Sequence, residues 1–224
     1  MQPDDPLRGQ LEYYRARARE YDTSLEAITA EADASPRGDQ REWAATIQAL
    51  RGIGPSGQVL ELAAGTGIWT QELLPLASQL TVLDGSPDML EINRARLSDP
   101  RVHYECVDLF AWQPEGEYDL VFFAFWLSHV PPDLLAPFLD NASRAVRPGG
   151  RLFIVDEPAG GRQLSGPSEA GIYQRRTVED GREFKIVKVY YDPVRIEEHF
   201  RERGFEALEL ITGEYFFHLI AKRA

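Results

Sequence analysis

The sequence of 224 residues is poor in cysteine and in cationic residues, and both shortages limit what the protein can be. With Cys106 as the single cysteine, no intrachain disulfide can form, and a thiolate zinc site would need more ligands than the chain offers. Residues 1–5 carry acids and no apolar run of signal-peptide type, and no segment approaches the ~20 apolar residues that span a bilayer. We therefore expect a cytoplasmic protein that uses no metal and is not inserted in a membrane.

The 24 basic residues are outnumbered by 36 acidic ones, which leaves a formal net charge of -12. Binding to DNA, RNA or anionic lipid depends mainly on clustered Lys and Arg, so a small-molecule partner is favoured over nucleic acid or a membrane surface. The hydrophobic fraction of 43% and the charged fraction of 27% are ordinary for a globular protein. Composition leaves the oligomeric state open.

Apolar runs alternate with amphipathic helical patterns through the middle of the chain. This alternation is typical of a parallel sheet covered by helices on both faces, and a single domain of this length can bury its core. Two further helices, at 10–31 and 40–50, are expected before the first strand from apolar spacings of three and four. The predicted strands are 59–62, 80–83, 102–106, 118–123 and 151–155, and the helices between them are 69–76, 89–97 and 134–146.

The strand and helix alternation stops after Asp156. Residues 157–171 are rich in Gly, Ser and Pro, and two β-prone runs follow at 173–178 and 184–191. Because Glu179-Asp180-Gly181-Arg182 separates these runs, we predict a β-hairpin within an insertion that spans 157–192. We expect this insertion to form a lid over the substrate together with the N-terminal helix.

The last 32 residues, 193–224, complete the predicted sheet. A helix at 193–203 is followed by strands at 206–211 and 215–221, which must be antiparallel because their connection is too short for a crossover. We therefore predict one α/β domain with a Rossmann-like core at 51–156. Its seven-stranded mixed sheet should carry one antiparallel strand at its end.

The segment Val59-Leu60-Glu61-Leu62-Ala63-Ala64-Gly65-Thr66-Gly67 joins a buried strand to a Gly-rich turn. Glycines at such a turn adopt positive φ and let the backbone approach a ligand closely. A plain strand-to-helix turn and a nicotinamide dinucleotide site share part of this pattern. The dinucleotide motif G-x-G-x-x-G requires a third glycine, and position 70 is Thr. A nicotinamide-dependent oxidoreductase stays an alternative, although this sequence lacks the third glycine of the dinucleotide motif.

A second acid, Asp84, ends the next predicted strand about 20 residues after the first glycine, where a carboxylate can accept both hydroxyls of a ribose. Taken together with Glu61, Gly65 and Gly67, it completes a series that resembles the class I S-adenosylmethionine-dependent methyltransferase family. The resemblance extends to Val107-Asp108-Leu109, Tyr118-Asp119-Leu120-Val121 and Val146-Arg147-Pro148-Gly149-Gly150.

This resemblance implies the class I methyltransferase fold, S-adenosyl-L-methionine as methyl donor, S-adenosyl-L-homocysteine as product, and no metal. Gly65 and Gly67 would lie against the methionine part of the cofactor, Glu61 would order their loop, and Asp84 would hold the ribose. Met89 would pack on the adenine, although a plain core residue also fits its position. Asp108 would read the adenine edge, although a turn-forming acid fits there too. The residues expected to bind the cofactor are Tyr14, Tyr21, Glu61, Ala63, Gly65, Gly67, Asp84, Gly85, Ser86, Met89, Asp108, Leu109 and Phe125.

Segments outside the cofactor motifs resemble the phosphonate O-methyltransferases of dehydrophos biosynthesis. The resemblance implies O-methylation of a small anionic acceptor and an N-terminal helical lid, within 1–50, that carries Tyr14 and Tyr21. Simple packing of a helix face is the alternative for both tyrosines. This sequence differs from those enzymes at 25–28 and at Phe125. An apolar carboxylic acid or another small oxyanion would suit these differences at least as well as a phosphonate. The segments that carry this resemblance are 13–22, 122–130, 175–182 and 186–189.

Two cationic side chains of the predicted hairpin, Arg176 and Lys188, resemble a phosphonate-binding pair. An anionic oxygen nucleophile is already deprotonated at neutral pH, so its site must supply positive charge and hydrogen-bond donors. We expect both side chains to clamp the acceptor. A solvated hairpin without a role in binding is the competing interpretation.

His129 follows the fourth predicted strand, at the carboxyl edge where active sites of open α/β sheets gather. We expect it to orient the nucleophile or accept its proton, with Trp126 also in the substrate site; a buried structural histidine is the alternative. A protein that binds the cofactor without catalysis would keep the same cofactor motifs. Nucleic acid methylation is disfavoured, because Phe125-Trp126-Leu127-Ser128 replaces an Asn-Pro-Pro-Tyr type motif.

Overall fold

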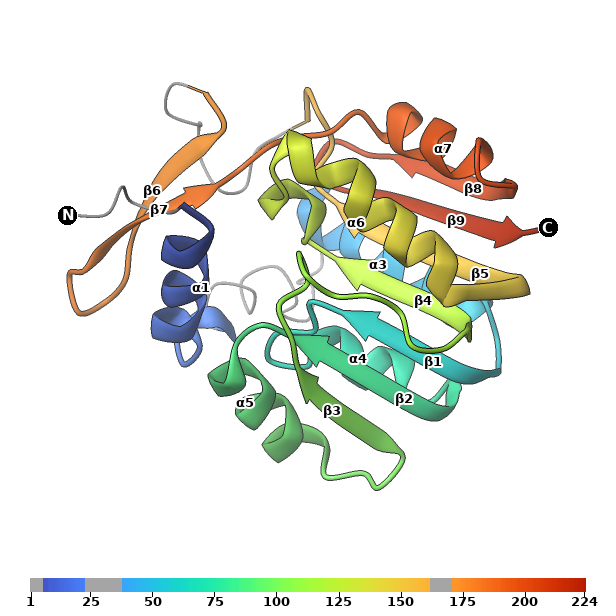
Figure 1. Ribbon diagram of the computed structural model, residues 1–224, viewed down its shortest axis with the longest axis horizontal. Helices are drawn as coiled ribbons and strands as arrows, with labels where there is room; N and C mark the ends of the chain where they lie inside the picture. The colour runs from blue at the N-terminus through green and yellow to red at the C-terminus, as the bar shows by residue number, and fades with distance from the viewer. Residues whose placement is uncertain (1–5, 23–37, 162–170) are drawn as a thin grey trace.

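The computed structural model describes residues 6–22, 38–161 and 171–224 of the chain. Seven strands form one sheet in the order β3-β2-β1-β4-β5-β9-β8, and β6 and β7 form a separate hairpin (Figure 1). The strands are β1 (Ser56–Leu62), β2 (Ala77–Asp84), β3 (Val102–Cys106), β4 (Tyr118–Ala124), β5 (Val146–Asp156), β6 (Tyr173–Thr177), β7 (Glu183–Val187), β8 (Phe205–Thr212) and β9 (Phe217–Arg223). The helices are α1 (Pro6–Arg17), α3 (Gly38–Gly52), α4 (Ile68–Leu73), α5 (Pro87–Leu97), the 3₁₀ helix η1 (Leu127–His129), α6 (Pro132–Ala145) and α7 (Pro193–Arg201).

The sheet is mixed, as the sequence predicts. Strands β1 to β5 are parallel, so their carboxyl ends lie at one edge, where Figure 1 places α1 and the β6–β7 hairpin. Strand β9 is antiparallel to both β5 and β8. The antiparallel strand is therefore not at the end of the sheet, as expected, but one position in from it. Strand β9 pairs with β5 on one side and with β8 on the other, so β8 forms the edge of the sheet.

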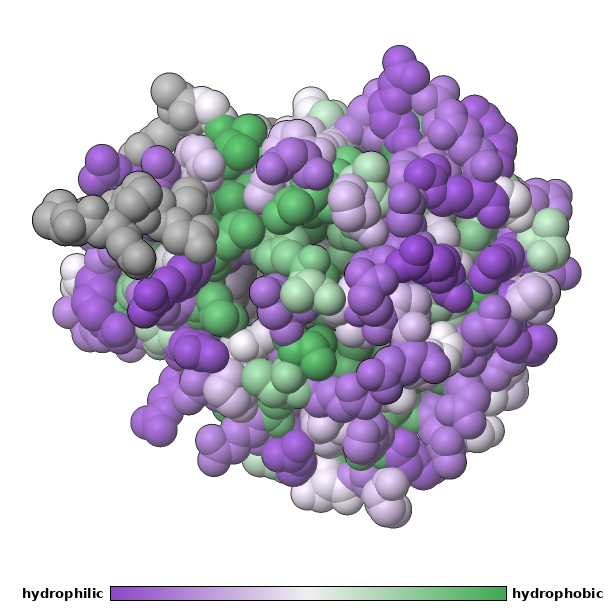
Figure 2. All heavy atoms as spheres, viewed as in Figure 1, coloured by the Kyte–Doolittle hydropathy of each residue, from purple (hydrophilic) through white to green (hydrophobic). Residues whose placement is uncertain are grey.

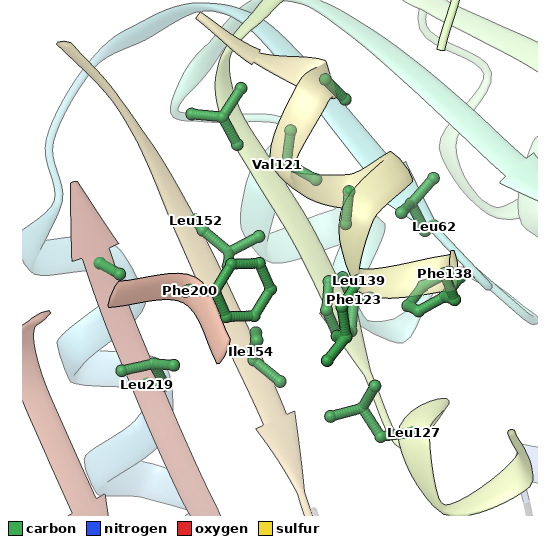
Figure 3. Packing of buried hydrophobic residues seen from close by; sticks show 14 of the residues in the cluster. Leu62, Val121, Phe123, Leu127, Phe138, Leu139, Leu152, Ile154, Phe200 and Leu219 are labelled. Atoms are coloured by element: carbon green, nitrogen blue, oxygen red, sulfur yellow. The ribbon is translucent and has the colours of Figure 1, made fainter. Parts of the chain in front are cut away.

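Both faces of the central strands are covered, which explains their continuous apolar runs. Leu120 to Phe123 of β4 are at most 1% exposed, although their side chains point alternately to the two faces. Helices α6 and α7 cover one face through Phe138, Leu139 and Phe200 (Figure 3). On the other face, α3 and α4 contribute Trp43, Trp69 and Leu73. This rigid sheet positions the loops at its carboxyl edge.

The N-terminal helix differs from the expected continuous helix at 10–31. Helix α1 ends at Arg17, and the amides of Ala18 and Glu20 donate to carbonyls three residues back, at 3.4 and 2.8 Å. The resulting turn lets the Arg17 guanidinium lie over the rings of both Tyr13 and Tyr21, at 5.7 and 5.2 Å. The remainder of the expected helix, residues 23–31, lies outside the described residues.

Most other boundaries differ from prediction by a few residues. The helix expected at 69–76 ends at Leu73, and the strand expected at 184–191 ends at Val187. Strand β5 begins at Val146 rather than Arg151, because Tyr118 of β4 pairs with Val146 before a bulge shifts the register. Among the described residues, no helix combines the length and apolar character that a bilayer crossing requires. Nor do their His, Cys, Asp and Glu side chains gather in groups that could hold a metal ion.

Candidate functional site

A cavity of about 520 Å³ opens at the carboxyl ends of the parallel strands, between the sheet and α1. In Figure 2, hydrophobic side chains gather along the seam between the part of the molecule that carries α1 and the hairpin and the body of the sheet. Four predicted site residues do not line the cavity: Glu61, Gly67, Arg176 and Lys188. The predicted residues that do line it are Tyr14, Tyr21, Ala63, Gly65, Asp84, Gly85, Ser86, Met89, Asp108, Leu109, Phe125, Trp126 and His129.

Asp84 joins the loops that follow β1 and β2. Its two carboxylate oxygens accept the backbone amides of Gly65 and Ser86, each at 2.8 Å. Burial raises the pKa of Asp84, and these backbone hydrogen bonds oppose that rise. A carboxylate has about four lone-pair sites, so Asp84 keeps acceptor capacity for a ligand hydroxyl besides the backbone amides that it binds. The carboxylate of Asp84 is therefore placed where it could accept the hydroxyl groups of the expected ribose.

Glu61 lies in β1 and is only 1% exposed. Its Oε2 atom has no hydrogen-bond partner among the described residues. Burial raises the pKa of Glu61 to about 8, against the lowering effect of a hydrogen bond with Thr70. Its side chain is therefore mostly protonated at neutral pH, and it lies inside the protein rather than on the cavity wall, so its ordering of the Gly-rich loop stays a prediction.

Asn93 of α5 supports the same loop and was not identified from the sequence. Its carboxamide is fully buried and donates to Oγ1 of Thr70 at 2.8 Å and to the carbonyl of Gly65 at 3.4 Å. Its Oδ1 accepts the Tyr104 hydroxyl at 3.1 Å. Gly67, with a φ of 93°, passes so close that an added Cβ would lie 2.7 Å from Cγ of Asn93. An Asn on the same helix face as Met89 is the signal that could have revealed it.

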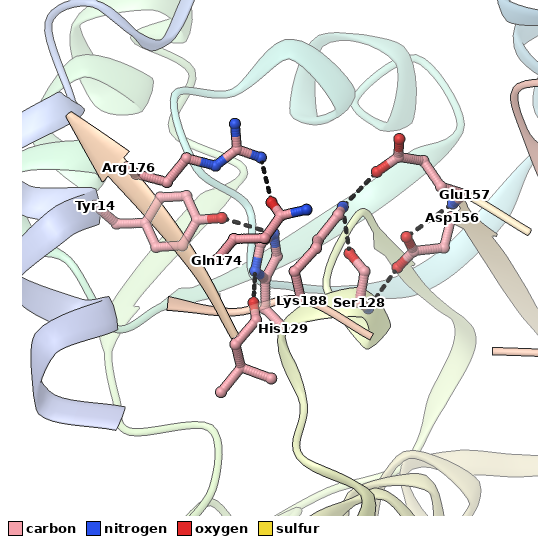
Figure 4. A network of polar contacts seen from close by, with 9 residues as sticks. Tyr14, Ser128, His129, Asp156, Glu157, Gln174, Arg176 and Lys188 are labelled. Carbon is pink, nitrogen blue, oxygen red and sulfur yellow. Dashed lines mark hydrogen bonds and ion pairs between the residues drawn. The ribbon is translucent and has the colours of Figure 1, made fainter. Parts of the chain in front are cut away.

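His129 lies at the opposite end of the cavity, on η1. Its Nδ1 lies 2.9 Å from the carbonyl of Val187, and its Nε2 lies 2.7 Å from the Tyr14 hydroxyl (Figure 4). A carbonyl only accepts, so Nδ1 carries the proton and Nε2 of the neutral ring accepts from Tyr14. Burial, followed by the charge of Lys188, lowers the pKa of His129 well below its ordinary value. The ring is neutral at physiological pH.

The predicted clamp residues, Arg176 and Lys188, do not line the cavity. Lys188 is 4% exposed, forms an ion pair with Glu157 and donates to Oγ of Ser128 at 3.1 Å (Figure 4). Burial also raises the pKa of the neighbouring Asp156 to about 6. Arg176 donates to Oε1 of Gln174 at 2.7 Å, and no carboxylate among the described residues pairs with it.

The electrostatic effect of these cations nevertheless reaches the cavity. Lys188, Arg176 and Arg17 each lower the pKa of His129 through their charge. The charges of these three cations therefore act at the place where His129 and Tyr14 meet, and each of them favours an anion there. The structure does not bring Arg176 and Lys188 into contact, so their role as a clamp stays a prediction.

The N-terminal segment forms much of the cavity wall, more than the two predicted tyrosines indicate. Asp22, beyond α1, accepts a hydrogen bond from Oγ1 of Thr66 at 2.5 Å and forms an ion pair with Arg96 of α5. This segment is thereby attached directly to the Gly-rich loop. The lining residues of α1 that sequence reasoning missed are Leu7, Arg8, Gln10, Leu11 and Arg15.

Aromatic side chains surround the end of β4. Phe125 has a φ of 54°, unusual for a residue with a Cβ, and its ring lies parallel to that of Trp43 at 6.1 Å. Trp126 contacts Phe110 with ring centroids 5.3 Å apart, and both line the cavity. This wall is aromatic, and the Nε1 atom of Trp126 in it is buried without a hydrogen-bond partner among the described residues.

Comparison with protein sequences identifies relatives of this chain. Residues 59–150 match a family model described as a methyltransferase domain. A demethylmenaquinone methyltransferase of Mycobacterium sp. (strain KMS) is 33% identical over 144 residues, which cover 64% of this chain and 57% of the relative. One from Mycobacterium tuberculosis (strain CDC 1551 / Oshkosh) is 35% identical over 142 residues, or 62% and 54% of the two chains. The chain thus spans little more than half the length of these curated relatives.

Comparison with solved structures covers the whole chain. A DhpI-SAM-HEP complex is 36% identical, covers 100% of both chains and has a TM-score of 0.81. A DhpI-SAH complex is 34% identical, covers 98% of this chain and 97% of the other, and has the same TM-score of 0.81. The N-methyltransferase NodS of Bradyrhizobium japonicum WM9, at 15% identity and a TM-score of 0.63, shares the fold. The cofactor motifs, the strand order and these similarities together show that the chain belongs to the class I S-adenosylmethionine-dependent methyltransferases.

Proposed function

We propose that the protein transfers a methyl group from S-adenosylmethionine to an oxygen of a small anionic acceptor, a phosphonate or a carboxylate. The observation that carries this proposal is a single cavity with two chemically different ends. Asp84 and the Gly-rich loop form one end, and the neutral His129, on which the charges of three cations act, forms the other. The similar DhpI was crystallised with SAM and HEP together, which supports a cofactor and a small ligand side by side.

The cofactor end has the properties that S-adenosylmethionine requires. Asp84 retains acceptor capacity for ribose hydroxyls, and Met89 lines the wall where an adenine could pack. When bound, the cofactor supplies an electrophilic methyl group on a sulfonium. The charge of that sulfonium would favour an anionic partner in the same cavity.

The acceptor end needs to position an oxygen rather than deprotonate it. Methyl transfer is an in-line displacement, so alignment of the acceptor and exclusion of water contribute most of what the protein supplies. Phosphonates and carboxylates carry an anionic oxygen at neutral pH, which removes the need for a base. Nε2 of His129 already accepts the Tyr14 hydroxyl, so we assign His129 an orienting role.

The anionic character of the acceptor is tested at Arg176, with Arg175 as its matched control. The two arginines are adjacent on β6 and point to opposite faces of the hairpin, and Arg175 lies on the exposed side near Glu183. The clamp hypothesis requires a charge-assisted hydrogen bond from Arg176 to the acceptor, and loss of such a bond costs about 1.5–3 kcal/mol, so Arg176→Ala should raise the acceptor KM roughly 10- to 100-fold. Arg175→Ala should leave it within about twofold, since an exposed ion pair contributes little. An unchanged rate and KM in Arg176→Ala would overturn the role of this cation.

A further inference from the structure

Gln10, His129 and Val187 form a closed ring of three hydrogen bonds at the acceptor end of the cavity. Nε2 of Gln10 donates to the carbonyl of His129 at 3.1 Å, and Nδ1 of His129 donates to the carbonyl of Val187 at 2.9 Å. The amide of Val187 donates to Oε1 of Gln10 at 3.1 Å, which closes the ring. Three elements that are distant in the sequence, α1, η1 and β7, are joined in this way.

The chemistry of the partners fixes every orientation in this ring. A backbone carbonyl can only accept and a backbone amide can only donate, so the Gln10 carboxamide has one possible orientation. The same rule requires the proton of the neutral His129 ring to be on Nδ1. Gln10 is 3% exposed and Val187 is fully buried, so water does not compete for these groups. Loss of one ring member would leave buried polar groups unsatisfied.

Tyr14 adds a second contact between α1 and the same histidine. Residues four apart lie on one face of a helix, so Gln10 and Tyr14 both reach His129 from α1. Gln10 holds the backbone carbonyl of His129, and Tyr14 donates to Nε2 of its ring at 2.7 Å. All three side chains line the cavity. Helix α1 therefore determines both the position and the hydrogen-bonding state of the imidazole.

We propose that Gln10 is a positioning residue of the acceptor site, which fixes His129 as the Nδ1-protonated tautomer and turns Nε2 toward Tyr14 and the cavity. This inference rests on the proposed function, since it concerns the geometry in which an acceptor is methylated. Apolar packing alone, as between Tyr13, Val178 and Ile186, would hold α1 on the hairpin without selecting a tautomer. The ring of hydrogen bonds selects one.

The tautomer can be observed directly by long-range ¹H–¹⁵N NMR of the four histidines, with the His129 signals assigned from a His129→Gln spectrum. Wild-type protein should show His129 with its proton on Nδ1 only. Gln10→Met keeps the length of the side chain and removes both of its hydrogen bonds, so the two ring nitrogens should move toward averaged shifts. Gln10→Glu removes only the donor to His129 and should shift the signals in the same direction. Glu12→Gln, on the exposed side of α1, should reproduce the wild-type spectrum.

Kinetics provide the second measurement. A displaced orienting group costs rate more than cofactor affinity, so Gln10→Met should lower kcat with the acceptor about tenfold or more while the Kd for S-adenosylhomocysteine stays within about threefold. If Gln10→Met does not fold, Gln10→Glu decides the question. An unchanged tautomer in a folded Gln10 variant would overturn the inference. If the wild-type protein transfers no methyl group but Gln10→Met still changes the tautomer of His129, the proposed function is overturned. The role of Gln10 in fixing that tautomer then remains.

Discussion

The hydroxyl of Tyr14 lies 2.7 Å from Nε2 of His129, and the opposite nitrogen of the same ring lies 2.9 Å from the carbonyl of Val187. These contacts leave the imidazole neutral and without a nitrogen that could readily take another proton. The histidine therefore holds a geometry, and an acceptor that is already anionic suits such a site.

The stability contributed by neutral His129 should depend on pH. Its pKa in the folded state is well below the ordinary value of about 6.5, so below pH 6.5 the unfolded chain binds a proton that the folded protein does not. The contribution is therefore present above pH 6.5 and is lost as the pH falls toward the folded pKa. In urea unfolding, the stability difference between wild type and His129→Gln should shrink by up to about 1.4 kcal/mol from pH 7.5 to pH 5.5. A difference that stays constant or grows at pH 5.5 would contradict the burial of a neutral ring.

Glu61 should show the opposite dependence. Its folded pKa of about 8 exceeds the ordinary value of 4.5, so the folded protein retains an extra proton between these values and loses stability as the pH rises through them. Glu61→Gln resembles the protonated form and does not titrate. Relative to wild type, the variant should gain roughly 1–4 kcal/mol of unfolding free energy between pH 5 and pH 8. Parallel pH profiles for the two proteins would show that Glu61 is ionised in the folded state.

Asn93 should affect cofactor binding through the Gly-rich loop. Asn93→Leu keeps the approximate volume and removes the donors to Thr70 and to the Gly65 carbonyl, so the loop loses its support from α5. The Kd for S-adenosylhomocysteine, measured by calorimetry, should rise about tenfold, as expected from the loss of one or two buried hydrogen bonds. Tyr104→Phe removes only the bond to Oδ1 of Asn93 and should change the Kd by less than about threefold. Equal effects of the two variants would assign the loss to general destabilisation of α5.

The buried pair Lys188 and Glu157 should behave as one unit. Lys188→Met removes the buried cation that forms an ion pair with Glu157 beside Asp156, which should cost about 3–5 kcal/mol of stability. Replacing both partners, with Lys188→Met and Glu157→Gln, should restore a large part of this loss. Chemical denaturation of the two single variants and the double variant measures the coupling. Additive losses would indicate that the ion pair is not formed in the folded protein.

The sequence predicted which residues gather around Asp84 and the Gly-rich loop, because these residues follow predictable strands. Asp84 and Gly65 each come directly after a buried apolar run, and the carboxyl ends of parallel strands meet at one edge. A local pattern therefore determined a three-dimensional neighbourhood. The five parallel strands β1 to β5 followed from the same alternation of strands and helices.

The contacts at the acceptor end could be predicted only in part, because they join segments that are far apart in the chain. His129 was predicted in the substrate site and Tyr14 as a cofactor-binding residue, but nothing in the local sequence indicates that Gln10 bridges His129 and Val187, or that Lys188 pairs with Glu157. Such pairings depend on how α1 and the hairpin dock, which periodicity does not specify. The position of β9 one strand in from the edge was also missed, because the short turn after β8 specifies antiparallel pairing but not which neighbour β9 joins on its other side.

The central claim, methyl transfer to a small anionic oxygen, is tested most directly with methyl-labelled S-adenosylmethionine and paired acceptors. Each pair consists of a small carboxylic acid and its uncharged primary amide, or of a small phosphonic acid and its uncharged diamide, so that the members differ mainly in charge. The wild-type protein should transfer label to at least one acid and not to the corresponding amide, since the cationic charges that act at His129 favour only the anion. Label found equally on the amide, or on no acid despite measurable binding of the cofactor, would contradict the claim.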